Sequence, residues 1–523
     1  IPEATLTAKP KEKMSHDDEK KEESKRAWYA DGIWQAPKLV RGIHLEIPPE
    51  EETATSWSEL FFDLIVVSVV AKMGGNLRES IEGGEEGGIN LQSYCMYFFG
   101  IIMSWLGAVE YNTRFGGDDL SHKVILAGFM LSVLMSSFHV GANYITEEAN
   151  GFYLSMTAIS IINVIIYLRI VRAFWNHPES KKPRNYGILN AAQAALMALL
   201  IFSATLVSQS NRWIVITLWF VVGNQRIFIF LSSKLRNKVF ANIYLPLTIE
   251  HVNERWGLIT MIVIGEGVDC LTEQVGNNVD DPIFILYVSM VFITLFCIKL
   301  AYFDSVADIV SMDDHPVRIH RWAGMLFGYC HWVSCASLAL LGTAIALTTE
   351  ELFGEEEEND REDEEIEDGG HFSVAIAYYA GTVSVIYFIF TILFMLKVER
   401  FPNNKKCRDF HLNLYTFEYV SGLFMSLIMA VIACQFSFLP TVSTWALVSL
   451  VTVSNLSIVA LDFFTKWCLF KTGTWGVDMQ YIYNPIGFIA AKLPNHPLAK
   501  DPINSHLFET EAVKNTESTR LFI

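Results

Sequence analysis

The strongest constraint in this sequence is a series of long apolar stretches that hold almost no charged residues. Hydrophobic residues make up 51% of the chain and charged residues 18%, and the charges gather in the first fifty residues, in short loops and in one acidic block. Apolar runs of roughly eighteen or more residues are typical of membrane helices, because lipid offers no partner to an unpaired backbone group. A large soluble protein would need polar faces interleaved with these runs. We therefore expect an all-α fold, a polytopic transmembrane helix bundle.

The sequence predicts about 12 membrane spans, and two of them differ from the rest. The first and seventh segments are short and carry carboxylates, whereas the other segments are more uniformly apolar. The expected spans cover residues 57–73, 91–110, 123–145, 152–174, 188–208, 212–231, 254–272, 282–303, 322–348, 373–396, 413–437 and 441–465.

Lysine and arginine alternate between the loops that join these spans. Every even-numbered loop carries at least two of them, whereas the odd-numbered loops offer only Arg78, Arg212 and Arg361. Basic residues are retained on the cytoplasmic side of short loops. The sequence therefore predicts that both termini are cytoplasmic and that the acidic loop 349–372 lies outside. We expect an integral protein of the plasma membrane, with the lipid bilayer as its first partner.

Charged residues at the starts of spans suggest an internal repeat. Glu59 opens the first span and Glu254 opens the seventh, 195 residues later. Asp118 and Asp313 follow in the loops after the next spans, again 195 residues apart. Six spans return the chain to its starting side, so two parallel six-helix pseudo-repeats would follow, unless the spacing is a coincidence among a few charges. The expected divisions are a cytoplasmic tail 1–52, a first transmembrane half 53–240, a second half 241–470 and a cytoplasmic tail 471–523.

Two motifs resemble the signatures of a known family. The segment WSELFFDL at 57–64 resembles the motif W-x-E-L-F-F-D-L, which opens the low temperature requirement A family of integral membrane proteins. The segment ERWGLITMIVIGE at 254–266 is similar to the second signature of that family. The resemblance covers roughly residues 37–470. It implies a membrane protein linked, in bacteria, to growth in the cold, and it implies no settled molecular activity or catalytic residues.

The first span carries two carboxylates that could do chemistry. An ionisable group at the centre of a bilayer helix costs about 2.5–3.5 kcal/mol, so its presence needs a reason. Glu59 and Asp63 are four residues apart and share one helical face. Two close carboxylates could exchange a proton or bind a cation. Alternatively, Glu59 lies at the helix entrance, where a negative charge complements the helix dipole.

The seventh span carries further candidates. Glu254 and Arg255 lie at its entrance, where dipole compensation and pairing at the interface would explain them. Glu266 lies about 18 Å along the helix, near mid-bilayer, and is either functional or one half of a buried pair. His139 and His331 fall inside the third and ninth spans, as proton relays or as neutral rings bonded to a carbonyl.

No catalytic motif accompanies these residues. The sequence contains no GxSxG, HExxH, Walker or Rossmann pattern, and no basic stripe with interleaved aromatics for nucleic acid. We therefore expect no cofactor and no nucleic-acid partner. The stretch from Asp304 to His320 imitates a metal site, but its spacing is too loose for us to predict a metal.

These observations leave three functional hypotheses. The leading one is a transporter or channel-like protein for protons, small ions or a proton-coupled solute. Its pathway would lie where spans one and seven face each other, with Asp63 and Glu266 in one polar cavity. The alternatives are an intramembrane lipid-modifying enzyme that uses the same acids, and a receptor or stress-related scaffold whose buried charges hold helices together. The sequence leaves the oligomeric state open.

Overall fold

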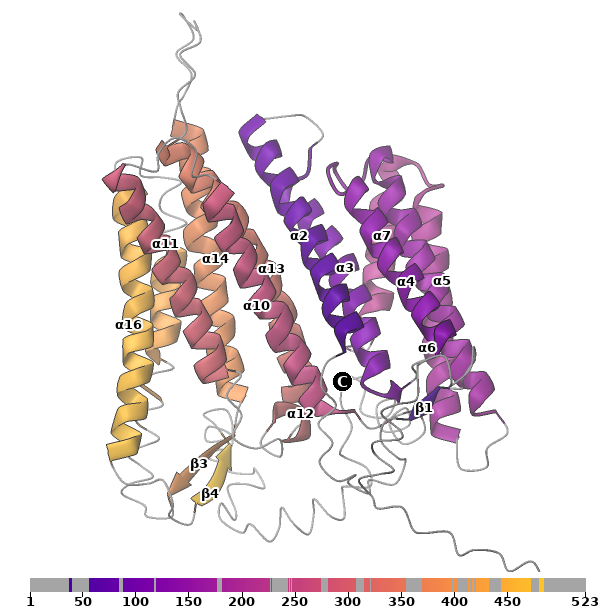
Figure 1. The fold of residues 1–523 in the computed structure, drawn as a ribbon. Helices are drawn as coiled ribbons and strands as arrows, with labels where there is room; N and C mark the ends of the chain where they lie inside the picture. The colour runs from indigo at the N-terminus through magenta and orange to yellow at the C-terminus, as the bar shows by residue number, and fades with distance from the viewer. Residues whose placement is uncertain are drawn as a thin grey trace, which may run out of the picture.

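The protein is a bundle of long helices in two groups that stand side by side (Figure 1). The structure is a computed structural model. It describes residues 37–39, 56–83, 88–116, 119–175, 181–225, 227, 243, 245, 247–273, 281–306, 315–319, 321–353, 369–396, 398–402, 413, 416–417, 420–431, 444–471 and 479–483.

The first group contains six helices from the N-terminal part of the chain. They are α2 (Trp57–Gly83), α3 (Leu91–Asn112), α4 (Leu120–Ser136), α5 (Asn150–Ala173), α6 (Lys181–Ala204) and α7 (Gln209–Gly223). Local chemistry sets some of their starts: the side chain of Asn90 accepts a 2.8 Å hydrogen bond from the backbone N–H of Ser93 and so caps α3. Helix α5 packs along α6 and also against α4.

The second group follows in the chain. It contains α10 (Ile249–Glu273), α11 (Pro282–Leu300), the π-helical turn η4 (Ala301–Val306), α12 (Pro316–Ile319), α13 (Arg321–Phe353), α14 (Gly369–Leu396) and α16 (Thr444–Lys471). Asp281 caps α11, and Pro282 occupies its first turn, where a missing N–H is harmless. Helix α13 packs against both α10 and α14, and α11 packs against α16.

Two short antiparallel strand pairs lie at one end of the bundle (Figure 1). Strand β1 (Lys38–Leu39) pairs with β2 (Phe115–Gly116), and β3 (Val398–Pro402) pairs with β4 (Met479–Tyr483). The all-α prediction therefore holds for the bundle but missed these pairs, because strands of two to five residues carry too little pattern to recognise. Of the expected N-terminal tail, the structure describes only residues 37–39, of which Lys38 and Leu39 pair with β2, just beyond the end of α3.

Seven helices among the described residues are long and apolar enough to cross a membrane. They are Trp57–Gly83, Leu120–His139, Glu147–Ala173, Lys181–Ala204, Pro282–Phe303, Ala323–Phe353 and Trp445–Thr465, and shorter apolar helices cover Ala377–Leu393 and Val420–Val431. The prediction of a helical membrane protein is confirmed. The count of twelve spans and the repeat stay predictions, and the expected division near residue 240 lies outside the described residues.

One span ends earlier than expected. We predicted a helix over 123–145, but α4 stops at Ser136 and continues only as the 3-10 turn η1 (Ser137–His139). The backbone then turns at Asn143, whose carbonyl accepts a bond from the N–H of Thr146. The prediction missed this break because the segment stays apolar beyond the end of the helix.

The larger of two hydrophobic clusters in the described residues runs through both groups of helices. It includes Val66 and Met73 of α2, Trp105 of α3, Ile259 of α10 and Leu338 of α13, all almost fully buried. Other large apolar side chains remain exposed on the outer faces, among them Leu131, Leu199, Phe202, Ile285 and Phe292. Apolar exposure on this scale suits contact with lipid rather than water.

Candidate functional site: an ionic ladder beside an interhelical cavity

Two contacts between a basic and an acidic side chain join the starts of α2 and α10. His251 Nε2 lies 3.0 Å from Glu59 Oε1, and Arg255 Nη2 lies 2.5 Å from Asp63 Oδ1. Both helices place their two residues four apart, so each pair of side chains lies one above the other on its helix. Both contacts join residues 192 apart, so the helices run parallel. We call these four residues the ionic ladder.

Glu59 also caps its own helix. Its Oε2 accepts hydrogen bonds from the backbone N–H and the hydroxyl of Ser56, at 2.9 and 3.0 Å, and the Ser56 hydroxyl lies 3.3 Å from the N–H of Glu59. This reciprocal pattern is a capping box. The side-chain amide of Asn112 reaches Glu59 Oε1 from α3 at 3.0 Å. The structure thus places Glu59 at the helix entrance, one of its two sequence interpretations, and adds contacts to Asn112 and His251 that the sequence analysis did not include. Its role in proton exchange or cation binding stays a prediction.

The buried side chain of Asp63 on α2 contacts both α3 and α10. Its Oδ1 also accepts a 2.6 Å hydrogen bond from Trp105 Nε1 on α3. The side chain of Asp63 is fully buried and that of Arg255 is 1% exposed. Among the described residues, Asp63 Oδ2 and two guanidinium nitrogens of Arg255 have no hydrogen-bond partner. Each charge is therefore tolerated mainly because the other lies beside it.

Glu266 does not share this site with Asp63. It lies eleven residues beyond Arg255 on α10, which corresponds to about 16 Å along the axis. The expectation of one cavity lined by Asp63 and Glu266 was therefore wrong. The sequence analysis used the depth of each acid and did not include the nearby Arg255 as the partner of Asp63. Glu254 is exposed beside the ladder, and Glu266 is half-buried.

The two histidines occupy different settings. His331 is 1% exposed on α13; its Nδ1 lies 2.8 Å from the carbonyl of Phe327 and its Nε2 lies 3.0 Å from the hydroxyl of Tyr302. Since a carbonyl only accepts, Nδ1 carries a proton, and the Tyr302 hydroxyl can donate to Nε2 of a neutral ring. His139 is exposed in η1 rather than inside a helix, and its ring lies against Gly151.

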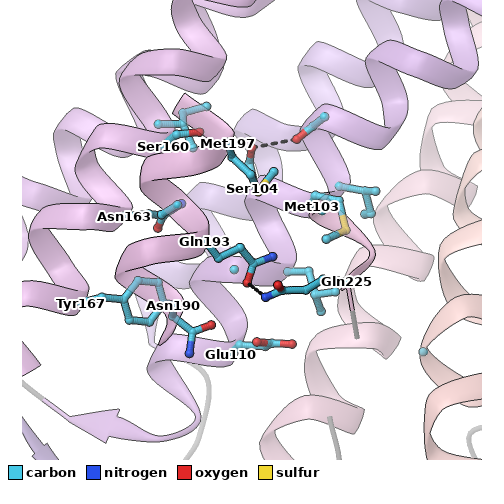
Figure 2. Close-up of a pocket in the computed structure, with 18 of the residues that line it drawn as sticks. Met103, Ser104, Glu110, Ser160, Asn163, Tyr167, Asn190, Gln193, Met197 and Gln225 are labelled. Atoms are coloured by element: carbon cyan, nitrogen blue, oxygen red, sulfur yellow. Dashed lines mark hydrogen bonds between the residues drawn. The ribbon is translucent and has the colours of Figure 1, made fainter. Parts of the chain in front are cut away.

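A cavity of ≈ 220 Å³ lies next to the ladder. Residues of α3, α5, α6 and α7 line most of it, and residues of α10 and α13 also line it, so it borders both groups of helices. Arg114, Gln225 and Ile243, which lie between helices, complete the described lining. Figure 2 shows Glu110, Asn190, Gln193 and Gln225 gathered in one part of the cavity, while Met103 lies in another. The cavity therefore has a polar part and an apolar part.

The polar part contains a buried acid and a buried base. Glu110 and Arg114 are 3% and 2% exposed, and their Oε2 and Nη1 atoms are 3.8 Å apart, beyond hydrogen-bond distance. The Arg114 guanidinium lies 5.4 Å from the centre of the Tyr186 ring. Gln225, two residues after the end of α7, donates a 2.5 Å hydrogen bond to the side-chain carbonyl of Gln193 on α6.

Two tryptophans connect the cavity to the ladder. Trp256 lines the cavity and follows Arg255 in α10, and its ring centre is 4.8 Å from that of Trp105. Trp105 in turn donates to Asp63. A displacement of either ring would therefore change both the wall of the cavity and the surroundings of the Asp63–Arg255 ion pair.

Sequence reasoning missed His251, Glu110 and the glutamine pair. A signal existed for His251: it precedes Arg255 by four residues, as Glu59 precedes Asp63, and opposite charges at equal spacing indicate facing helices. No such signal exists for Gln193 and Gln225, because their meeting depends on how α6 and α7 cross.

No group of three or more His, Cys, Asp or Glu residues in the described part of the chain is placed to hold a metal ion. Of the stretch that imitated a metal site, Asp308 and His320 lie outside the described residues.

A family model covers most of the chain. The model described as bacterial low temperature requirement A protein (LtrA) matches residues 54–456. This range includes the ladder and the lining of the cavity. No curated protein and no solved structure matches the chain.

Proposed function

Since the chain belongs to the low temperature requirement A family, we propose that it is a carrier of the plasma membrane that moves a small solute through the cavity beside the ladder. In this proposal the chain crosses the membrane twelve times as two parallel six-helix halves, with both termini in the cytoplasm. The loop asymmetry of Lys and Arg supports the orientation.

The observation that carries the proposal is the cavity itself. Pockets between the helices of a bundle, mostly apolar and with a few converging polar groups, are where small molecules bind. Here buried Glu110 and Arg114 and the bonded Gln193 and Gln225 converge on ≈ 220 Å³ of space at the border of two helix groups. Movement of one group against the other would change access to this space.

The ionic ladder opposes such a movement of the two helix groups. Asp63 and Arg255 are too well buried to line a pathway, so we assign them to holding α2 and α10 in register. Parting them would leave two charges in a dry interior, at a cost of several kcal/mol. The state described here is therefore favoured until ligand binding offsets that cost.

Transport by purified protein in liposomes tests the proposal. Uptake is measured for labelled glucose, phenylalanine, choline, phosphate and rubidium, and proton flux with an internal pH dye. The decisive variant is Gly107→Phe: Gly107 lines the cavity, and a Cβ added there would meet nothing within 4 Å, so the new ring fills the cavity. The matched control is Gly75→Phe, at an exposed position of α2 with equally open space.

We expect at least one probe to enter faster than into empty liposomes, with Gly107→Phe abolishing the uptake and Gly75→Phe leaving it unchanged. Uptake that survives Gly107→Phe would move the pathway elsewhere. No flux of any probe would reject the carrier and favour the receptor or scaffold hypothesis, and conversion of bilayer lipid by the same sample would favour the enzyme.

A further inference from the structure

We infer that the cavity binds a zwitterionic amine–carboxylate with a large apolar side chain, the chemical class of the aromatic and larger aliphatic amino acids. This inference deepens the proposed function by naming the class of solute, and it rests on the same cavity. It is carried by the charge, the spacing and the lining of that cavity.

The first argument is the pair of opposite charges. Glu110 lies in the last turn of α3, Arg114 lies in the turn just after this helix, and both line the cavity. Their facing atoms Oε2 and Nη1 are 3.8 Å apart, and Nη1 donates a 3.0 Å hydrogen bond to the backbone carbonyl of Glu110. Both side chains are more than nine-tenths buried, and they are the charged residues among the described lining residues.

The second argument is charge balance. The described lining carries one negative and one positive group, so its formal charge is zero. A ligand with a single charge would add an uncompensated charge to a buried site, and such a charge is costly. A zwitterion adds none, and each of its ends meets an opposite charge: an ammonium at Glu110 and a carboxylate at Arg114. Charge-assisted hydrogen bonds of this kind are stronger than neutral ones.

The amides around the pair suit a compact headgroup. Gln193 accepts from Gln225 and also donates to the backbone carbonyl of Val222 at 3.2 Å, so its orientation is fixed from two sides. Asn190 is held by a 2.9 Å bond from its amide to the carbonyl of Tyr186. In Figure 2, Asn190, Gln193 and Gln225 lie around Glu110. Amides held in place can donate to a carboxylate and accept from an ammonium without adding charge.

The rest of the lining fits an apolar side chain. It contains four methionines and three tryptophans: Met103, Met156, Met197, Met325, Trp219, Trp256 and Trp332. Methionine side chains adapt to irregular shapes and contact aromatic rings favourably. A cavity of about 150 Å³ in another protein holds benzene, so ≈ 220 Å³ has room for one ring and a small headgroup.

Thermal unfolding of the purified full-length protein in detergent, followed by tryptophan fluorescence, tests the inference. Phenylalanine is compared with phenethylamine, which lacks the carboxylate, with phenylpropionate, which lacks the ammonium, and with glycine, which lacks the side chain. We expect phenylalanine to raise the melting temperature at concentrations at least tenfold lower than any of the other three. Equal or stronger stabilisation by one of the singly charged compounds or by glycine would overturn the inference, as would no stabilisation by phenylalanine.

Two variants give a crossed readout that a structural role would not produce. Glu110→Gln removes the partner of the ligand's ammonium and leaves Arg114 to bind its carboxylate, so the affinity for phenylpropionate should rise relative to that for phenylalanine. Arg114→Gln should shift the preference toward phenethylamine. Glu254→Gln, an exposed acid on α10, should change neither preference. If the ligands stabilise both cavity variants in the same order as the wild type, Glu110 and Arg114 do not recognise the charged groups of the ligand, and the inference is rejected. If neither variant folds, the wild-type ligand series alone decides.

Failure of the inference is distinguishable from failure of the carrier. If phenylalanine does not bind, yet Gly107→Phe blocks the flux of another probe, the solute class is wrong and the carrier stands. If phenylalanine binds but neither phenylalanine nor any other probe crosses liposome membranes, the binding site stands and the carrier is rejected.

Discussion

Arg255 and Asp63 form a 2.5 Å ion pair between α10 and α2 in which neither side chain is more than 1% exposed. The contact links the first helices of the two groups, and Trp105 adds α3 on the same carboxylate oxygen. Buried pairs of this kind fix how helices align more than they stabilise them, since desolvation offsets the attraction.

Asp63→Asn should destabilise the protein by about 3–5 kcal/mol, because Arg255 would keep its buried charge without a counter-charge. Thermal unfolding in detergent should show a clear fall in melting temperature. The double variant Asp63→Leu with Arg255→Met should recover most of the loss, since no charge then remains buried. Glu254→Gln, next in the chain but exposed, should stay close to wild type. A wild-type melting temperature for Asp63→Asn would contradict the role assigned to the pair.

Ser56→Ala should loosen the first turn of α2. The substitution removes the hydroxyl side of the capping box with Glu59 and should cost about 0.5–2 kcal/mol locally. Hydrogen exchange in a peptide covering the start of α2 should become faster, while exchange in α5 should not change. Ser58→Ala provides the control, because Ser58 is exposed in the same turn. Equal exchange in both variants would show that the cap is not formed.

Gly151→Ala should destabilise the junction of η1 and α5. A Cβ at Gly151 would overlap the His139 ring, and overpacking of this kind costs about 1–3 kcal/mol. Adding His139→Ala should relieve the clash and restore the melting temperature. Gly128→Ala is the matched control: the nearest side chain, that of Ile162, is 3.7 Å away, so helix propensity should make the variant neutral or slightly more stable. If His139→Ala gives no rescue, the two residues do not meet.

An epitope tag inserted at Asn359, between α13 and α14, should be labelled on intact cells, and a tag after Ile523 should be labelled only after permeabilisation. This follows from the distribution of Lys and Arg between the loops. The reverse pattern would invert the orientation. Labelling of both tags on intact cells would mean an even number of spans between them, where the sequence predicts three.

The sequence predicted much of the helical framework because its signal is strong: a long apolar run has few folded alternatives in lipid. It also predicted that the spans beginning near Glu59 and Glu254 face each other, and α2 and α10 do make contact through the ladder. The partner of Asp63 was missed because Arg255 was assigned to the membrane interface. The four-residue spacing that His251 and Arg255 share with Glu59 and Asp63 was the signal for this pairing.

The cavity could not be predicted from the sequence. Glu110 and Arg114 resemble ordinary charges at the end of a span, where water and lipid headgroups would satisfy them. Arg114 lies over the ring of Tyr186, which belongs to a hydrophobic cluster with Phe115 of β2, Tyr167 of α5 and Leu245, and Leu39 of β1 packs against this cluster. Such packing depends on contacts between distant parts of the chain, and short strands such as β1 leave no periodic pattern.

The two ends of α2 are held by contacts of different electrostatic character. At its start, the Asp63–Arg255 pair is dry; near its end, Arg78 pairs with Glu350 of α13, with side chains 22% and 43% exposed. Mobile ions weaken the interaction between exposed charges, with a screening length of about 8 Å at physiological ionic strength. They weaken the interaction between buried charges much less. Raising the salt concentration should therefore loosen the attachment of α2 to α13 while the attachment to α10 stays intact. The ionic strength of the medium thus acts on one end of this helix alone.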